Sequence, residues 1–131
     1  MDTRAAARRW ASVWARAWPL ADIDAITALY APGAVFYSHP FRDRQDPAEY
    51  VAWAFEDQHS AECRFGDPVV DGSRAAVDWC AVVTAKDGSE QSLAGTSLLR
   101  FDPDGLVVEQ RDAWGEANGH HALPDWAAPG R

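Results

Sequence analysis

Apolar residues near the start of the chain recur at helical spacing. Between residues 5 and 18 they follow one another in steps of three and four, while the arginines fall off this stripe. The stripe consists of Ala6, Trp10, Val13, Trp14 and Ala17. The pattern predicts a helix over 5–18, and Pro19 is expected to stop it.

Two further helices are predicted before residue 60. Asp22 is suited to cap a helix over 23–30, which the sequence APG would end. A short β-prone segment follows at 34–39, and a third helix is predicted to run from Asp46 to about residue 58. The start signals of this third helix are Asp46 as the cap, Pro47 at the first helical position and Glu49 three residues after the cap.

After residue 60 the pattern changes to alternation, which is typical of β-strands. The predicted strands span 62–70, 74–85, 91–101 and 106–114, and the sequences DGS, KDGSE and DPDG form the turns between them. Long strands joined by short turns indicate an antiparallel meander, and helices must cover one of its faces. The expected fold class is therefore α+β. Residues 116–131 contain Gly and Pro without a period, and an irregular tail is predicted there.

Composition narrows the classes of partner. The chain has 131 residues, 47% of them apolar, which suits one domain with a packed core. A formal net charge of −8 argues against nucleic acid and against anionic membrane surfaces, because no basic stripe is present. The two cysteines form neither a disulfide framework nor a metal motif. No signal core or membrane span is recognisable, so a cytoplasmic protein is expected.

Several segments, in their order along the chain, resemble a known family. DIDAITALYAPGAVF, DGSRAAVDW, LAGTSLLRFDPDG and VVEQRDAW are similar to the SnoaL-like branch of the nuclear transport factor 2-like superfamily, which includes ketosteroid isomerase, limonene epoxide hydrolase and polyketide cyclases. The resemblance covers about residues 8–115 of a single domain spanning 1–131. It implies a conical barrel, in which a strongly bent antiparallel sheet wraps around three N-terminal helices and leaves a deep apolar pocket. It also implies a small apolar molecule as partner and a homodimer formed through the outer sheet face.

The last strand carries the sharpest candidate for chemistry. Alternation places Val108, Gln110, Asp112 and Trp114 on one face, and the implied cone directs the last three inward. The QRDAW segment resembles the family strand whose Asp is an acid or base in the epoxide hydrolase and the cyclases. A carboxylate in an apolar hollow is expected to have a raised pKa, which suits proton transfer near neutral pH. The alternative is a structural Asp112, hydrogen-bonded to Trp14, Trp79 or a loop amide.

Other candidates are weaker. His39 is a second candidate catalytic residue at the cone mouth, where it could pair with the carboxylate. Alternatively it is a surface histidine fixed by Pro40, and a shift of one residue would turn Ser38 inward instead. The candidate substrate-binding residues are Trp14, Ser38, Trp53, Trp79, Ser97, Gln110 and Trp114. The tryptophans among them would serve equally as plain core.

Departures from the family pattern argue against two specific mechanisms. The Arg–Asp pair of the epoxide hydrolase would fall near Trp79 and Ala81. The Tyr and two Asp residues of ketosteroid isomerase would fall on Trp14, on Ser38 or His39, and on Ser97. Neither relay is therefore implied for this chain.

The expected function is that of a small-molecule pocket protein. It would be a cofactor-independent isomerase, cyclase or hydrolase with Asp112 as acid or base, or else a non-catalytic binding or dimerisation module with a filled cone. A cavity above roughly 300 Å³ reaching Asp112 favours the first, and tight stacking of Trp79 on Trp114 favours the second. No phosphate-binding loop is present, and His120, His121 and Asp125 lack the supporting pattern of a metal site. No cofactor or metal is predicted.

Overall fold

Helices and strands follow one another in the order helix, helix, strand, helix and then five strands. The structure is a computed structural model that describes residues 1–128 and 130. Its elements are α1 (Thr3–Leu20), α2 (Ile23–Thr27), β1 (Tyr30–Tyr37), α3 (Pro47–Phe55), β2 (Gln58–Phe65), β3 (Val69–Asp71), β4 (Arg74–Ala85), β5 (Glu90–Phe101), β6 (Val107–Asn118) and the 3₁₀ turn η1 (Asp125–Ala127). The α+β fold class predicted from the pattern is confirmed.

Helix α1 continues past the position where Pro19 was expected to stop it. The helix ends at Leu20, so the proline lies within its last turn. A proline has no N–H for the carbonyl four residues earlier, which here belongs to Ala15. The thiol of Cys63 on β2 donates to that carbonyl oxygen at 3.6 Å, and burial raises the pKa of Cys63 to about 12, so the thiol keeps its proton. The helix thus runs two residues beyond its predicted end, and a thiol from a distant strand satisfies the carbonyl that the proline leaves free.

The boundary between α2 and β1 differs from the prediction. Helix α2 ends at Thr27, and the strand starts at Tyr30 instead of residue 34. Tyr30 pairs with Val107 of β6, and the N–H of Val107 donates to the Leu29 carbonyl at 2.9 Å. The APG sequence thus interrupts a strand as an irregularity, with Gly33 at a φ of 76°, and does not terminate a helix.

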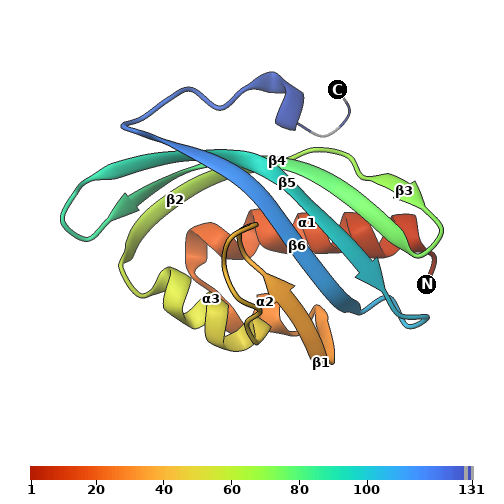
Figure 1. Cartoon of the computed structure of the whole chain (residues 1–131). Coiled ribbons are helices and arrows are strands. Elements are labelled where there is room, and N and C mark those ends of the chain that lie inside the picture. Colours follow the sequence, from red (N-terminus) through yellow and green to blue (C-terminus); the bar gives the residue numbers. More distant parts are fainter. Residues whose placement is uncertain (129, 131) are drawn as a thin grey trace.

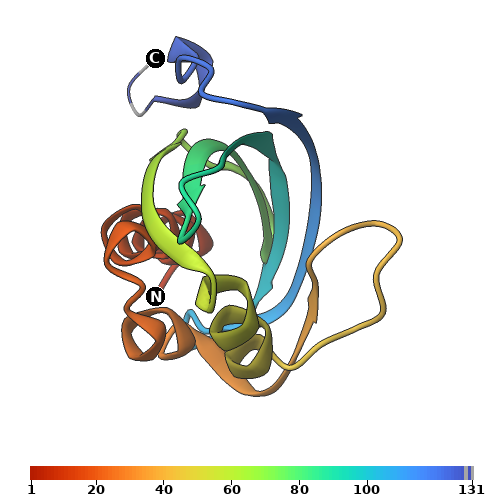
Figure 2. The same cartoon turned by 90° about the vertical axis from the view of Figure 1, so that its left-hand side faces the viewer.

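The strands form one strongly curled sheet. Its order is β1-β6-β5-β4-β2, with β3 paired to β4. The predicted meander of β4, β5 and β6 is antiparallel, whereas β1 joins the edge of β6 in parallel. Figures 1 and 2 show the sheet curving around α1, with α2 and α3 on its open side. The curl produces a hollow between the inner sheet face and the helices.

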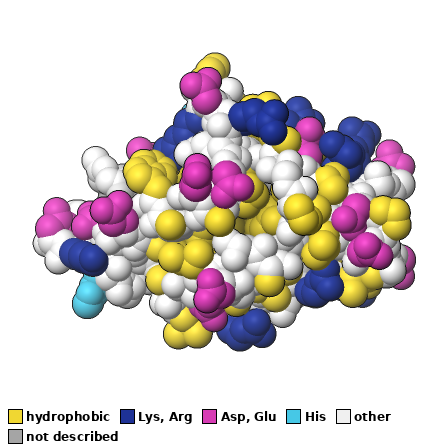
Figure 3. Space-filling view, turned by 90° about the horizontal axis from the view of Figure 1, so that it is seen from below, with side chains coloured by type: hydrophobic (Ala, Val, Ile, Leu, Met, Phe, Trp, Pro, Cys, Tyr) yellow, Lys and Arg dark blue, Asp and Glu magenta, His cyan; other side chains and the backbone are white. Residues whose placement is uncertain are grey.

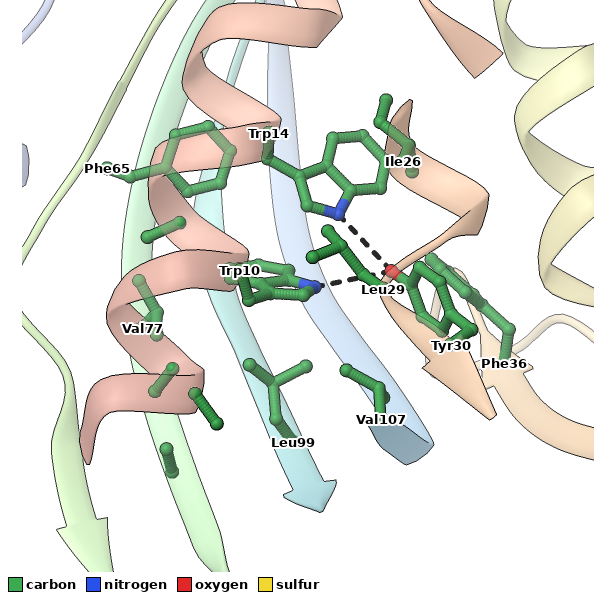
Figure 4. Packing of buried hydrophobic residues seen from close by; sticks show 14 of the residues in the cluster. Trp10, Trp14, Ile26, Leu29, Tyr30, Phe36, Phe65, Val77, Leu99 and Val107 are labelled. Atoms are coloured by element: carbon green, nitrogen blue, oxygen red, sulfur yellow. Dashed lines mark hydrogen bonds between the residues drawn. The ribbon is translucent and has the colours of Figure 1, made fainter. Parts of the chain in front are cut away.

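Aromatic side chains from α1 fill the part of this hollow that forms the core. Trp10 is 1% exposed and Trp14 is 7% exposed, and both direct their indole N–H groups at the hydroxyl of Tyr30 (Figure 4). An irregularity between β5 and β6 turns Val107 into this core, so Val107 is fully buried and Val108 is not. The expected alternation of β6 therefore holds only from residue 110 onward.

The C-terminal segment lies against the outer face of the sheet. Strand β6 runs to Asn118, four residues beyond the predicted end, and the chain then folds back over the convex side (Figure 1). A guanidinium nitrogen of Arg64 donates to the carbonyl of Leu123 at 3.3 Å, and Ala127 of η1 is fully buried. Part of the outer face is thus covered by the chain's own tail. Homodimerisation through that face stays a prediction.

The underside of the molecule mixes charge types. Figure 3 shows hydrophobic side chains over the middle of this face, with acidic and basic side chains spread around them. The large apolar side chains that are most exposed include Phe41, at 93%, and Trp53, at 57%. Within residues 1–128 and 130, no helix combines the length and apolar character needed to cross a membrane.

Candidate active site

A cavity of about 670 Å³ lies between the inner sheet face and the helices. Buried side chains of α1, β5 and β6 form its inner part. Its mouth lies among the more exposed lining residues, which come from the loop after β1, the end of α3, the β4–β5 turn and the end of β6. Six of the seven tryptophans line it, namely Trp10, Trp14, Trp18, Trp53, Trp79 and Trp114. No ring contact joins Trp79 to Trp114 in the described part of the chain. Trp79 and Trp114 therefore do not stack on each other, and the cavity is large enough for a small organic molecule.

Asp112 lies on the wall of this cavity and is 9% exposed. Its Oδ1 atom accepts a 2.6 Å hydrogen bond from the hydroxyl of Ser97 and a 3.0 Å bond from the amide nitrogen of Gln110. Its Oδ2 atom has no hydrogen-bond partner among residues 1–128 and 130. Oδ2 is consequently the carboxylate oxygen left for a ligand.

The surroundings of Asp112 adjust its acidity. Burial raises the pKa of Asp112 to about 7, while the bonds from Ser97 and Gln110 act in the opposite direction. A carboxyl group with a pKa near 7 is populated in both protonation states at neutral pH. Such a group can both take and give a proton without a large energetic cost.

Gln110 is held by the tryptophans and the tyrosine of the core. Its Oε1 atom accepts a hydrogen bond from the hydroxyl of Tyr30 and a 3.2 Å bond from the indole of Trp10. The indole of Trp14 donates to the same Tyr30 hydroxyl at 3.2 Å. Because Oε1 is occupied by donors, the amide nitrogen of Gln110 must face Asp112. The orientation of the amide is thus fixed from the far side of the core.

Trp79 orients Ser97 as the core residues orient Gln110. Its indole nitrogen donates to the oxygen of Ser97 at 3.0 Å, so the hydroxyl proton of Ser97 is directed at Asp112. The hydrogen-bond partners of Asp112 are Ser97 and Gln110, and not Trp79 or Trp14, the tryptophans named as its structural alternative. The indole of Trp79 acts on Asp112 through Ser97, and the indole of Trp14 acts through Tyr30 and then Gln110.

The cavity mouth contains a cation that the sequence did not point to. The guanidinium carbon of Arg42 lies 5.4 Å from the ring centroids of both Trp53 and Trp114. The indole of Trp114 is itself held by a 2.6 Å hydrogen bond to the carbonyl of Ser38. Arg42 follows the first strand in a short polar loop, where nothing in the local sequence separates it from a solvated residue.

Tyr50 is a second cavity residue that the sequence analysis missed. Burial raises the pKa of Tyr50 to about 12, the negative charge of Asp112 raises it further, and the positive charge of Arg42 lowers it. The phenol is therefore a protonated hydrogen-bond donor at neutral pH. Tyr50 lies within electrostatic reach of both charged groups, from α3, whereas they come from β6 and the loop before α3.

His39 and Ser38 are not brought into the cavity lining. Both residues follow the end of β1 in a bend, where Ser38 is fully buried and His39 is half-buried. The Ser38 hydroxyl donates to the Gln45 side chain at 2.8 Å, and the ring of His39 lies edge-on to Trp114 at 5.1 Å. The acid–base pair of His39 with Asp112 is therefore not assembled here. The other predicted site residues, Trp14, Trp53, Trp79, Ser97, Gln110 and Trp114, all line the cavity with Asp112.

Of the two histidines near the C-terminus, His120 contacts carboxylates, while the ring of His121 lies 3.1 Å from the backbone carbonyl of Asn118. The ring nitrogens of His120 lie 3.2 Å from Glu62 and 3.1 Å from Glu90, and Asp125 lies 3.7 Å from Arg64. Across residues 1–128 and 130, no group of three or more His, Cys, Asp or Glu residues is arranged to hold a metal ion.

A known domain family matches most of the sequence. The sequence profile of the SnoaL-like domain matches residues 7–110. None of the curated proteins matches the sequence significantly.

Solved structures share the fold at low sequence identity. SalBIII, an epoxide hydrolase/cyclase-like enzyme of pyran ring formation in the polyether salinomycin, has a TM-score of 0.75 at 18% identity, over 90% of this chain and 98% of its own. An LEH-like epoxide hydrolase of M. tuberculosis has a TM-score of 0.68 at 15% identity, over 87% and 86% of the two chains. A protein of ketosteroid isomerase-like fold from Catenulispora acidiphila, in complex with trimethylamine, has 0.67 at 15% identity, over 77% and 81%. At these identities the likeness concerns the fold alone.

Proposed function

The chain belongs to the SnoaL-like domain family of the nuclear transport factor 2-like superfamily, and from this premise we propose that it is a small-molecule enzyme in which Asp112 transfers protons. The substrate is a small, largely apolar or aromatic molecule that fills the cavity. The reaction is a cofactor-independent isomerisation or cyclisation, in which a proton is removed from one atom of the substrate and returned to another.

One observation carries this proposal. Asp112 combines a free Oδ2 atom, a pKa of about 7 and a place on the wall of an aromatic cavity. A carboxylate with a purely structural role does not need a position on the lining of a ligand-sized cavity. Perturbed titration in a concave apolar site is typical of catalytic groups.

The surrounding residues support the proton transfer in distinct ways. The ionised Oδ2 of Asp112 accepts a proton from a carbon or hydroxyl group of the substrate. Ser97 and Gln110 hold Oδ1 in place during the transfer, and Trp79 fixes the hydroxyl of Ser97. The neutral carboxyl then gives the proton to the new position, so the enzyme ends the cycle unchanged.

Hydrolysis of an epoxide by a carboxylate relay is less well supported. The positions that the relay needs hold Trp79 and Ala81, and neither side chain ionises. Asp112 is the one buried carboxylate among the described residues that line the cavity, so removal and return of a single proton is the chemistry that the residues match best.

A non-catalytic binding module is the alternative. The two hydrogen bonds to Oδ1 and the link from Gln110 to Tyr30 are what a purely structural carboxyl group would also have. In that case the cavity binds a ligand without changing it.

The variant Asp112→Asn separates the two functions. A thermal-shift screen of terpenoid, steroid and aromatic compounds first identifies a ligand class, and turnover is then followed by mass spectrometry. Asp112→Asn is expected to keep ligand binding and lose turnover, while Asp78→Asn on the outer sheet face keeps both. An active Asp112→Asn variant would dismiss the acid–base role, and a wild type that binds without converting any bound compound would favour the binding module.

A further inference from the structure

Arg42 lines the same cavity as Asp112 but stands at the mouth. Its loop is anchored on both sides. The N–H of Arg42 donates to the His39 carbonyl at 3.1 Å, and Gln45 exchanges backbone hydrogen bonds of 3.2 and 2.7 Å with Phe36. The side chain is therefore presented from a fixed backbone.

The guanidinium group is fixed as well. Trp53 and Trp114 lie at equal distances of 5.4 Å from its central carbon, and the terminal nitrogen Nη1 donates to the Ser38 hydroxyl at 3.1 Å. Indole rings attract a guanidinium group and hold its plane. Arginine has five N–H donors. Ser38 takes one of them, and the Tyr50 hydroxyl is a second hydrogen-bond partner of the guanidinium. A planar fork of donors is left for another group.

No carboxylate of the described chain neutralises Arg42. The ion pairs of residues 1–128 and 130 involve Arg64, Arg100, Arg111 and His120 with nearby acidic side chains. The chain has 20 acidic residues against 12 Lys and Arg, so acidic partners are in excess. A half-buried cation that lines a cavity and lacks a counter-ion in such a protein is suited to receive its counter-ion from a ligand.

We propose that the substrate carries a carboxylate group, which the guanidinium of Arg42 binds at the cavity mouth while the apolar part of the molecule lies among the tryptophans and reaches Asp112. This inference rests on the proposed function, because it names the substrate class of the same cavity. Tyr50, on which the charges of Arg42 and Asp112 both act, lines the same cavity. The carboxylate thus sets which atom of the substrate faces Oδ2 of Asp112.

Binding of a matched pair of probes tests the proposal without any turnover. 2-Naphthoate and 2-naphthamide have nearly the same shape and differ in charge. Isothermal titration calorimetry at pH 7.5 is expected to give the wild type a Kd for naphthoate about tenfold below that for naphthamide, since a charge-assisted hydrogen bond contributes at least that factor. Arg42→Gln should bring the two Kd values together, chiefly by weakening the naphthoate complex.

Two control variants locate the effect. Arg44→Gln changes an exposed arginine of the same loop, and Lys86→Gln removes the other cation that lines the cavity. Both are expected to retain the preference for naphthoate. Asp112→Asn should also retain it, so loss of turnover in that variant and loss of preference in Arg42→Gln are separate results.

Several outcomes would overturn the proposal. These are equal affinity of the wild type for both probes, no saturable binding of either at millimolar concentration, an unchanged preference in Arg42→Gln, or a preference lost in Lys86→Gln instead. Circular dichroism checks that Arg42→Gln is folded. If it is not, the wild-type preference must fall as salt rises from about 10 mM to about 500 mM, and a salt-independent preference refutes the charge-based contact.

Discussion

Ser97 and Asp112 are direct partners across β5 and β6, and the hydroxyl of Ser97 donates a 2.6 Å hydrogen bond to Oδ1 of Asp112. Side chains at opposed positions of an antiparallel pair lie close enough for such a contact. The same hydroxyl accepts from Trp79, on the next strand of the sheet. The orientation of the candidate acid–base group is therefore a property of strand register, and a shift of one residue would remove it.

The raised pKa of Asp112 predicts a stability that falls as pH rises. The pKa is about 7 in the folded protein against 3.8 for the ordinary side chain, so between these values the folded state binds more protons than the unfolded state. Stability from the neutral carboxyl is complete below pH 3.8 and is lost as pH rises through 7. Relative to Asp112→Asn, the wild type should lose roughly 4 kcal/mol between about pH 4 and about pH 8. Urea unfolding of both proteins measures this, and parallel pH profiles would contradict it.

Ser97→Ala should raise the pKa of Asp112 above 7. The hydrogen bond from Ser97 favours the ionised carboxylate, and removing it takes that support away. The indole nitrogen of Trp79 also loses its acceptor, which is expected to cost about 1–3 kcal/mol of folding free energy. Carbon-detected NMR titration of the Asp112 carboxyl group reports the shift. Ser92→Ala, on the same strand but the opposite face, should leave that titration unchanged.

Tyr30→Phe should destabilise the protein and loosen Gln110. The Tyr30 hydroxyl accepts from Trp14 and donates to Gln110, and the indole of Trp14 would be left without a partner. An unsatisfied buried donor costs about 1–3 kcal/mol. Thermal unfolding compares this variant with Tyr37→Phe, whose hydroxyl makes no hydrogen bond within residues 1–128 and 130. Equal melting temperatures of the two variants would show that the Tyr30 hydroxyl contributes nothing.

Gly95→Ala should displace the cavity wall. A Cβ atom at Gly95 would lie 2.5 Å from Cβ of Trp114 and 2.6 Å from its Cα, so the β5–β6 pair must open. Overpacking of this kind costs about 1–3 kcal/mol, and it should also weaken ligand binding because Trp114 lines the cavity. Gly115→Ala is the matched control, since no atom lies within 4 Å of its added methyl group. A Gly95→Ala variant as stable as Gly115→Ala would refute the close approach.

The sequence by itself determined the outline of the fold and part of the site. Period-two alternation sets which side chains of a strand share a face, whatever the rest of the chain does, so the pattern alone places Gln110, Asp112 and Trp114 on one side. Helical spacing likewise places Trp10 and Trp14 on the same face of α1. The turn sequences DGS, KDGSE and DPDG indicated that consecutive strands pair as an antiparallel meander.

Tertiary structure alone decided what depends on contacts between distant segments. The parallel pairing of β1 with β6 moved a strand boundary, and the Cys63 thiol bonds the Ala15 carbonyl that Pro19 leaves without a donor. Arg42 reaches the cavity from a loop whose local pattern resembles any solvated segment, and Tyr50 reaches it from α3, where nothing in the local sequence marks it as a cavity residue. The pKa of Asp112 likewise follows from burial, which the folded packing creates and no single strand encodes. Neighbours in space set these properties, whereas periodicity along the chain encodes only neighbours in sequence.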